Sequence, residues 1–463
     1  MKKIVLITTT FLISTSCVLH STQDLAIEKR VIPEQFLKND DVMSHSVEKF
    51  WKSPFENAEL EKIVNLALKN NYSLQIALQH LQKSEATFKK TNSDRLPDLD
   101  LETSSQVTRS KIADSLDTRD SSNSMGLALS WELDLWGRLK HLSASENLEF
   151  KATEQDVQAT YLLVVSSVIE NYLDLSTAQQ EQKLLSQIED SRKDEYTVNH
   201  ELYKTGGVEL SALNIAKSNY KKAQYERSQS NKNVSNLKSS LAIILGINAD
   251  QLEEAGLVKY KSSVKIGNVD LMKTRPDLIA AEQRVLASIE KTKAVKLERL
   301  PSLNVNLGYG FAASSVSDMY KNTVFNSLIG LNLPIFRAGE ITQNINIAKS
   351  DQEIRTLEFL ELSNKVVNEV SASYKNLESE KESLKFAQEK LQVAKDTLDI
   401  DMQLYNAGRI KYLAFLESKL KLLEEQNLYN SANNLYLQSI LNVYRSIGGM
   451  AFQHNKKGIS NES

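Results

Sequence analysis

The fold is decided by the stretch Met125–Leu135, which reads Met-Gly-Leu-Ala-Leu-Ser-Trp-Glu-Leu-Asp-Leu. Every second residue is large and apolar, and the residues between them are small or polar. Strict alternation over this length predicts a β-strand with one apolar face and one polar face. The same alternation occurs three more times, so we expect strands at about 98–108, 125–135, 302–311 and 325–336. The polar segment 109–124 is expected to lie outside the strands.

Alternation over about ten residues is typical of strands that cross an outer membrane. A half-buried antiparallel sheet in a soluble domain gives the same pattern and is the alternative interpretation. Four strands cannot close a membrane barrel, because the smallest such barrels have about eight. Since open strand edges are not tolerated in lipid, a membrane location requires several chains to share one barrel.

The chain contains two copies of one structural plan. Five landmarks return after a shift of 202 or 204 residues. The pairs are Arg95–Pro97 with Arg299–Pro301, Tyr203–Gly206 with Tyr405–Gly408, Gly137 with Gly339, Gly246 with Gly448, and Asn71–Leu74 with Arg275–Leu278. A nearly constant shift across separate landmarks indicates an internal repeat.

Long helices follow each pair of strands. No Gly or Pro occurs between Gly137 and Gly206, or between Gly339 and Gly408. An unbroken helix of about 65 residues would be about 100 Å long. A shorter helix is expected to return over 209–245 and 411–447, which makes each copy a helical hairpin with coiled-coil packing. A further helix, with apolar spacing from Leu60 to Leu81, is expected before the strands of the first copy.

The N-terminus has the features of an export signal. Two lysines precede an apolar stretch, and small residues then lead to Cys17, the only cysteine of the chain. This arrangement resembles a bacterial lipobox, in which the cysteine becomes the acylated N-terminus, although Ser14 stands where that pattern prefers Leu. An ordinary signal peptide is the alternative. The expected plan is a signal peptide 1–16, an extended segment 17–55, a first repeat 56–246, a connection 247–274, a second repeat 275–449 and a tail 450–463.

Composition excludes several classes of protein. Lys and Arg number 56 and Asp and Glu 59, a net charge of −3, which argues against a nucleic-acid binder that relies on basic charge. One cysteine allows neither an internal disulfide nor a cysteine zinc site. The six histidines stand singly, without metal-ligand spacing. We find no catalytic constellation and no cofactor motif, so an enzyme has no support.

These features together resemble the outer-membrane factor (TolC) family, and most closely its lipoprotein branch of efflux channels. The motifs that carry the resemblance are Arg275-Pro-Asp-Leu278 and Trp131-Glu-Leu-Asp-Leu-Trp-Gly-Arg138, within the repeated strand–strand–helix–helix plan. The resemblance implies an α+β membrane protein, with four strands per chain in a barrel of twelve strands shared by a homotrimer. The barrel would continue as a long α-helical barrel in the periplasm, with residues 247–274 at its equator.

The resemblance also implies function and partners. The family is a passive exit duct, lipid-anchored in the bacterial outer membrane in this branch. It works with a periplasmic adaptor protein and an inner-membrane pump, here expected to be of the RND type, and needs no cofactor.

The resemblance places a gate at the periplasmic tip. Leu413 falls at the apolar ring position and Glu417 at an acidic one, while Ala414 stands at a second position that is acidic in some members. The contacts that hold the tip shut map to Tyr405 and Arg409 (or Ile410) in the second copy, and near Glu209 and Ser211 in the first.

Two other functions stay open at this point. A duct of a type I protein secretion system has the same architecture, and Cys17 with Arg275–Asp277 favours the efflux branch. A periplasmic coiled-coil protein without a channel is the third possibility, and the four alternating strands argue against it.

Overall fold

The computed structural model describes residues 55, 57–112, 116–252, 255–256 and 275–449. The expected signal peptide, Cys17, the tail 450–463, the segment 17–55 apart from Phe55 and most of the connection 247–274 lie outside the described residues.

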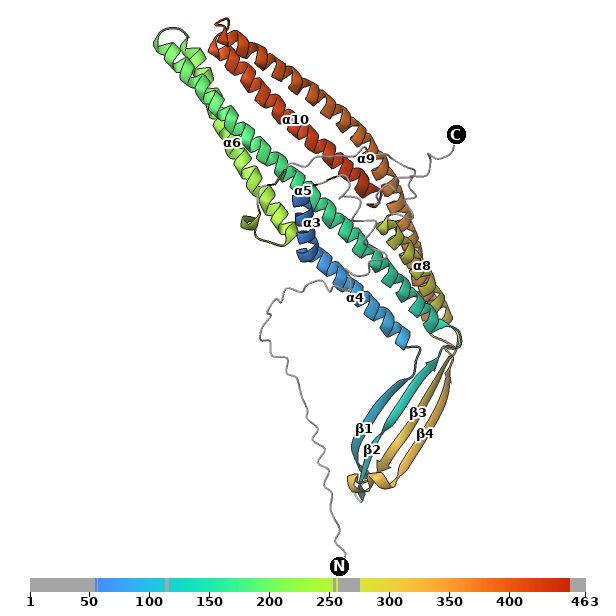
Figure 1. The fold of residues 1–463 in the computed structure, drawn as a ribbon. Coiled ribbons are helices and arrows are strands. Elements are labelled where there is room, and N and C mark those ends of the chain that lie inside the picture. Colours follow the sequence, from blue (N-terminus) through green and yellow to red (C-terminus); the bar gives the residue numbers. More distant parts are fainter. Residues whose placement is uncertain (1–54, 56, 113–115, 253–254, 257–274, 450–463) are drawn as a thin grey trace, which may run out of the picture.

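The described chain is elongated, with a sheet at one end and two helical hairpins that reach away from it (Figure 1). The first repeat contains α3 (Ala58–Asn70), α4 (Tyr72–Ser93), β1 (Asp98–Ile112), β2 (Leu116–Leu133), α5 (Arg138–Lys204) and α6 (Leu210–Leu245). The short 3-10 helix η2 (Ala249–Gln251) follows. The second repeat contains α8 (Pro276–Leu297), β3 (Ser302–Ala313), η3 (Val316–Lys321), β4 (Thr323–Asn332), α9 (Glu340–Asn406) and α10 (Tyr412–Ser446).

The four strands form one antiparallel sheet in the order β1-β2-β3-β4. The prediction that 109–124 lies outside the strands is wrong, because β1 continues to Ile112 and β2 begins at Leu116. Polar cross-strand contacts hold this part of the ladder, as between the hydroxyls of Ser104 and Ser124 at 2.8 Å. Alternation of apolar residues therefore located the apolar band but not the ends of the strands. β4 ends at Asn332, before Pro334, which cannot donate a hydrogen bond to a ladder.

The helix expected from Leu60 to Leu81 is two helices, α3 and α4, joined at Asn71. The Asn71 side chain causes the break, because its Oδ1 accepts from the backbone N–H of Leu74 at 3.1 Å and caps α4. Its Nδ2 donates to the carbonyl of Ile244 at 2.8 Å, in the last turn of α6. One side chain thus joins the start of one helix to the end of another.

Helices α5 and α9 each contain 67 residues, as the absence of Gly and Pro indicated. α6 and α10 return beside them, so each repeat ends in an antiparallel hairpin (Figure 1). The main apolar core lies where α3, α5, α6 and α10 meet, around fully buried side chains of Leu60, Ile169, Tyr172, Leu241 and Ile440. We call this level the equator.

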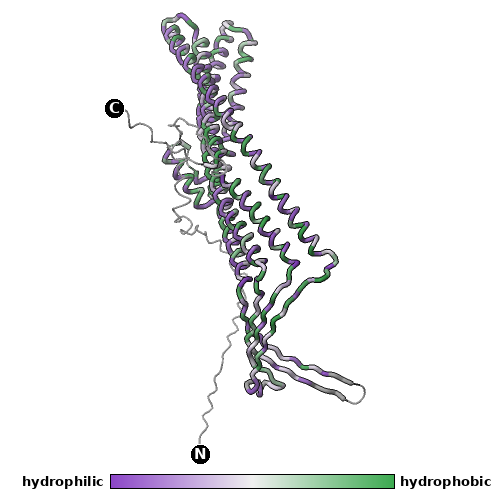
Figure 2. Tube along the Cα trace, turned by 90° about the vertical axis from the view of Figure 1, so that its right-hand side faces the viewer, coloured by the Kyte–Doolittle hydropathy of each residue, from purple (hydrophilic) through white to green (hydrophobic). Residues whose placement is uncertain are grey.

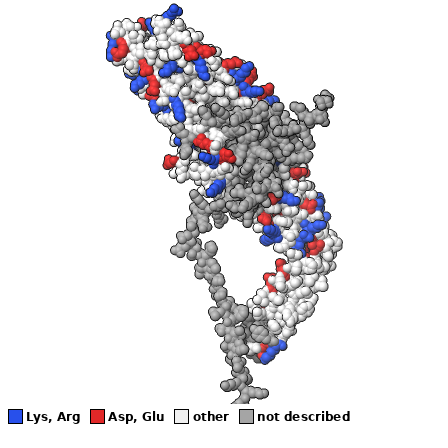
Figure 3. Space-filling model, in the orientation of Figure 1, with Lys and Arg blue, Asp and Glu red and all other residues white. Residues whose placement is uncertain are grey.

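Figures 2 and 3 show how polarity is distributed along the molecule. Apolar and polar residues are mixed along the helices, and most of the charged side chains on the visible face lie over them. None of the helices that the structure describes has an apolar stretch long enough to cross a membrane.

Candidate functional site

The two hairpin tips lie together at the end of the molecule farthest from the sheet (Figure 1). A groove of about 840 Å³ separates the first turns of α10 from the first hairpin. Its α10 wall includes Leu413, Glu417 and Lys421, and its opposite wall includes Arg192 of α5 and Ile215 of α6. The gate positions expected from the sequence therefore share one groove.

Leu413 and Glu417 are one helical turn apart and differ in exposure, since Leu413 is half-buried and Glu417 is exposed. The next residue, Ser418, donates its hydroxyl to the carboxylate of Asp401 on α9. This bond joins α9 and α10, the two helices of the second hairpin, at the residue after Glu417. Glu417 itself is exposed and lines the groove.

The residues expected to lock the tip contact their own hairpins. Tyr405 stacks on Phe415 with ring centroids 5.5 Å apart, and lies 5.6 Å from the ring of Tyr412. Glu209 accepts a long hydrogen bond of 3.4 Å from the hydroxyl of Ser211. Among the described residues, no hydrogen bond, ion pair or ring contact joins Tyr405 or Arg409 of the second tip to Glu209 or Ser211 of the first.

Arg409 is exposed at the turn of the second tip, and its backbone N–H closes that turn by donating to the carbonyl of Leu404 at 2.8 Å. Burial raises the pKa of the neighbouring Tyr412, and the charge of Asp194 on α5 raises it further. Tyr412 therefore stays a neutral phenol at neutral pH.

A buried carboxylate further along α10 holds the second hairpin together. Glu425 of α10 is 4% exposed and lies 2.8 Å from the ammonium of Lys421 and 2.9 Å from that of Lys390 on α9. The hydrogen bond from Lys421 lowers the pKa of Glu425 and the one from Lys390 lowers it further. In the first hairpin, Glu189 of α5 pairs instead with Arg227 of α6 at 2.8 Å.

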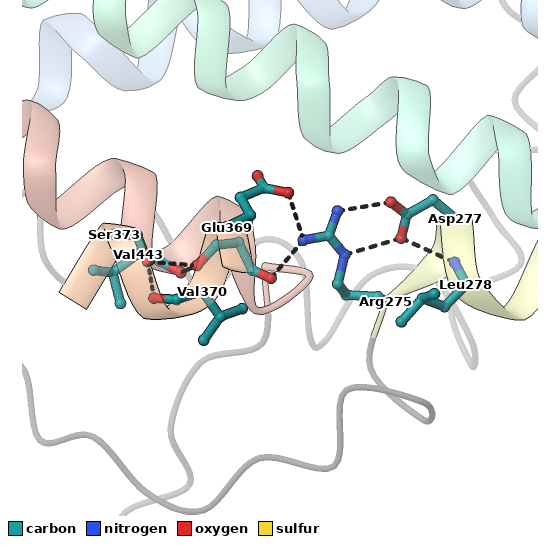
Figure 4. Close-up of polar contacts among 8 residues, drawn as sticks. Arg275, Asp277, Leu278, Glu369, Val370, Ser373 and Val443 are labelled. Atoms are coloured by element: carbon teal, nitrogen blue, oxygen red, sulfur yellow. Dashed lines mark hydrogen bonds and ion pairs between the residues drawn. The ribbon is translucent and has the colours of Figure 1, made fainter. Parts of the chain in front are cut away.

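A second polar cluster lies at the equator, where the second repeat begins (Figure 4). The guanidinium of Arg275 donates from Nε and Nη2 to the two oxygens of Asp277, at 3.0 and 2.7 Å. Its Nη1 donates to Glu369 of α9 at 3.1 Å and to the carbonyl of Ser446 at 2.7 Å. One side chain thus connects the ends of α8 and α10 to the middle of α9.

The equator of the first repeat has a corresponding contact, made by a shorter and uncharged side chain. Asn71 stands at the position of Arg275, and Ile244, whose carbonyl it contacts, stands 202 residues before Ser446. Both side chains satisfy a carbonyl that a helix end leaves free. The repeat in the sequence is therefore a repeat of contacts.

Sequence reasoning missed several of these groups. It named Arg275 and Asp277 only as a motif, and it did not find Glu369, Glu425 or the aromatic contacts of Tyr405. The spacing of Lys421 and Glu425 at i, i+4 was a visible signal. No sequence spacing indicates that Lys390 pairs with Glu425 or that Glu369 pairs with Arg275, because both ion pairs depend on how α9 packs.

The described residues contain no group of three His, Cys, Asp or Glu side chains that could hold a metal ion.

Comparison with known proteins identifies the family. A family model described as outer membrane efflux protein matches residues 63–246 and 269–449, two blocks that coincide with the two repeats. Cation efflux system protein CusC of Escherichia coli O157:H7 is 24% identical over 434 residues, which are 90% of this chain and 93% of that protein. The probable outer membrane lipoprotein SilC of Salmonella typhimurium is 22% identical over 428 residues, 90% of this chain and 92% of that protein.

Solved structures have the same fold. The outer membrane channel CmeC of Campylobacter jejuni gives a TM-score of 0.79 at 24% identity, over 88% of this chain and 89% of that chain. This match confirms the fold class expected from the sequence. With a family model that covers both repeats, this chain belongs to the outer membrane efflux protein family.

Proposed function

We propose that three copies of this chain form the passive exit duct of a tripartite efflux system, joined through a periplasmic adaptor to an inner-membrane pump. The observation that carries the proposal is that both edges of the chain carry groups suited to a neighbouring copy. β1 and β4 are the outer strands of the sheet. A closed barrel removes such edges, and a ring of identical chains can supply the closure.

The helices support the same ring. α9 lies along one edge of the helical layer, and α4 and α6 lie along the other (Figure 1). Near its tip, α9 exposes Phe386, Val393 and Ile400, each seven residues from the next. On the other edge α4 exposes Tyr72 and Ile76, and α6 exposes Ile215 and Tyr225. A seven-residue apolar row is typical of a helix that packs against a partner helix.

The proposed closure is head-to-tail, with β4 and α9 of one copy against β1, α4 and α6 of the next. Mass measurement in mild detergent is expected to show a trimer. Val393→Asp should weaken the trimer, because it places three carboxylates in apolar contacts, whereas Lys395→Asp, on an exposed position two residues away, should not. A stable wild-type monomer would remove both the barrel and the channel.

The relatives favour efflux over protein secretion. CusC is named for cation efflux, and CmeC is described as an outer membrane channel. The adaptor, a pump of the RND type and the trimer are our proposal, supported by the resemblance to this family and by the edges described above. The domain boundaries expected from the sequence also stay predictions.

Lipidation is a further part of the proposal, supported by the lipobox-like sequence and by the name of SilC. Cys17→Ser should abolish incorporation of labelled palmitate and leave the precursor uncut by the lipoprotein signal peptidase. Metabolic labelling and the mass of the mature N-terminus test this. A mature wild-type protein that starts elsewhere and carries no acyl chain would contradict the lipid anchor and leave the barrel in place.

The gate is the third part, supported by the shared groove of Leu413 and Glu417. Three copies of Glu417 around one axis would form an acidic ring, and such rings attract cations and repel anions. We expect isolated trimers to conduct poorly and to prefer cations in planar bilayers. Glu417→Ala should reduce the cation preference severalfold while trimers still assemble, and Leu413→Ala should raise conductance by widening the apolar constriction.

Arg409→Ala serves as the contrasting variant, because it should raise the open fraction without changing selectivity. The gate would be wrongly placed if selectivity were unchanged in Glu417→Ala and conductance were unchanged in Leu413→Ala.

A further inference from the structure

The contact between the two repeats of one chain gives a template for the contact between two copies. α8 packs between α5 and α9 (Figure 1). Its counterpart α4 packs against α5 on one side, and Tyr72 and Ile76 of α4 are exposed. In a head-to-tail ring, α9 of one copy meets α4 of the next in the place where α5 meets α8 within a chain.

The repeat is regular enough for this template to be used residue by residue. α4 and α8 contain 22 residues each, and α5 and α9 contain 67 each. The strand pairing keeps the same correspondence, since Asp98 faces Ser130 in β1–β2 and Ser302 faces Asn332 in β3–β4. Each position of α4 and α9 thus has a known counterpart in α8 and α5.

Exposure changes at these counterparts in the way that an unfilled interface requires. Ala152 of α5 is fully buried, but its counterpart Ile354 of α9 is 52% exposed. Ala280 of α8 is 1% exposed, but its counterpart Ile76 of α4 is 57% exposed. Large apolar side chains thus stand on both free faces at positions that are buried in the other repeat, which indicates that another copy covers them.

One basic side chain links α8 to α5 in the internal contact. The guanidinium of Arg284 on α8 donates to the carboxylate of Asp156 on α5. The Nε of Arg284 also lies 3.7 Å from a carboxylate oxygen of Glu149, two helical turns away on α5. A single cation thus pairs with two carboxylates that are seven residues apart.

The free faces carry the same arrangement of charge. His80 of α4 stands at the position of Arg284, and α9 has carboxylates, Glu358 and Asp351, at both acidic positions. All three side chains are exposed, and the His80 imidazole makes no hydrogen bond or ion pair with another described residue. The two faces are therefore complementary in charge as well as in apolar area.

We propose that His80 of each copy pairs with Glu358 and Asp351 of the next copy, which makes the contact between copies sensitive to protons. This inference rests on the proposed function, because it needs the ring of three chains. A guanidinium is charged at every physiological pH, whereas an imidazole gains its charge only as the pH falls through about 6.5. The ring would thus contain three proton-dependent pairs where each chain contains one constant pair.

The charged groups that face His80 from α9 differ in sign. Glu358 and Asp351 attract an imidazolium. Arg355 repels it and also competes for Glu358, because its guanidinium donates to one carboxylate oxygen of Glu358 at 2.9 Å. That competing pair is half-exposed on both sides, so it holds Glu358 only weakly.

The neighbours of His80 in its own chain also differ in sign. Lys83 lies one helical turn further along α4 and adds a positive charge. α5, on the other side of α4, carries Glu154 and Asp156 beside Val157, which packs against Leu81. Arg284 already engages Asp156, so three carboxylates and two cations remain around His80 in the ring. This balance favours a protonated imidazole.

The pH dependence of trimer dissociation tests the pair. Full-length trimers in mild detergent are expected to be more stable at about pH 5.5 than at about pH 7.5, because protonated His80 attracts two carboxylates. An exposed ion pair changes an equilibrium constant about 1.5- to 5-fold, and three pairs act in one ring. We therefore expect His80 to account for a roughly tenfold change in the trimer dissociation constant.

Three variants isolate this contribution. His80→Gln should remove it, and His80→Arg should give the stability of the low-pH trimer at both pH values. His200→Gln is the matched control, because it removes an exposed imidazole that lies beside Glu201 near the tip, and it should keep the wild-type dependence. The same pH dependence in His80→Gln as in wild type would overturn the proposed pair.

A disulfide tests the register. In the internal contact, the hydroxyl of Ser145 donates to the carbonyl of Ala287 at 2.9 Å, and the counterparts of these residues are Ile347 and Lys83. Lys83→Cys with Ile347→Cys should therefore link neighbouring copies under mild oxidation. Lys83→Cys with Ile354→Cys is the offset control, about 10 Å away along α9, which is beyond the reach of a disulfide. Wild type, with Cys17 alone, measures the background.

Linked chains on non-reducing gels are expected for the first double variant and not for the second. Links in the offset variant, or in neither, would refute the register and the pair with it. The mass of each unoxidised sample separates the two proposals. A trimer without the expected link refutes this inference alone, and a wild-type monomer refutes the proposed function as well.

Discussion

Gly310→Ala is expected to prevent assembly of the trimer. Gly310 of β3 lies directly opposite Gly126 of β2, and the two backbones approach closely. A methyl group on Gly310 would lie 2.5 Å from the Cα of Gly126 and closer still to the carbonyl oxygen of Met125. Both obstacles are backbone atoms of a hydrogen-bonded ladder, so no side chain can rotate away to make room.

We expect the two glycines to allow the sheet to curve. They lie on its polar face, and the next cross-strand pair on the same face is Ala128 with Gly308. Small residues on one face allow a sheet to bend toward that face, and glycine kinks are a usual device of barrel closure. Overpacking of a well-packed site costs about 1–3 kcal/mol in each chain, and three chains share the closed ring. The loss of assembly should therefore exceed the loss of stability in one chain.

Two alanine variants in the same sheet are the matched controls. A methyl group on Gly308 would make ordinary contacts, with side-chain atoms of Asn326 from 3.6 Å and the carbonyl oxygen of Leu127 at 4.0 Å, and one on Gly330 would meet nothing within 4 Å. Gly308→Ala and Gly330→Ala should assemble like wild type when trimer yield and thermal dissociation are measured in mild detergent. If Gly310→Ala forms trimers with wild-type stability, the close approach of β2 and β3 is not needed for closure.

Much of the architecture could be predicted from the sequence because it depends on periodicity. Alternation located all four strands, and the lack of Gly and Pro between Gly137 and Gly206 predicted α5 almost to the residue. Strand ends were less accessible, since polar residues such as Ser104 and Asn123 pair across β1 and β2 as well as apolar ones do. The break at Asn71 was missed because a capping side chain leaves the apolar spacing of the two helices unchanged.

The candidate gate shows a different limit. Leu413 and Glu417 could be placed by resemblance, and the structure puts them in one groove. The opposite wall of that groove, which includes Arg192 and Ile215, could not be predicted, because α10 meets the first hairpin only through tertiary packing. The same holds for Lys390, whose ion pair with Glu425 crosses between two helices that run in opposite directions.

Arg275→Ala is expected to cause the largest loss of stability of any single change in the polar cluster at the equator. Arg275 is 8% exposed, and its removal leaves the carboxylates of Asp277 and Glu369 and the carbonyl of Ser446 without their donor (Figure 4). Breaking a buried ion pair by removing one partner costs about 3–5 kcal/mol. Both carboxylates are about a third exposed, at 33% and 35%, and water can solvate them in part, so we expect about 3 kcal/mol.

The repeat supplies a matched comparison for this loss. Asn71→Ala removes the corresponding contact to Ile244 and the cap of α4, but it leaves no charge without a partner. A cap of this kind is worth about 1 kcal/mol, so the first repeat should lose less than the second. Arg275→Lys keeps the charge but cannot reach Asp277, Glu369 and Ser446 together, because an ammonium lacks the planar fork of a guanidinium. Thermal and denaturant unfolding of the three variants as trimers should rank them Arg275→Ala, Arg275→Lys, Asn71→Ala in decreasing loss. Equal losses for Arg275→Ala and Asn71→Ala would show that the carbonyl contact alone, and not the charge, holds the equator of the second repeat.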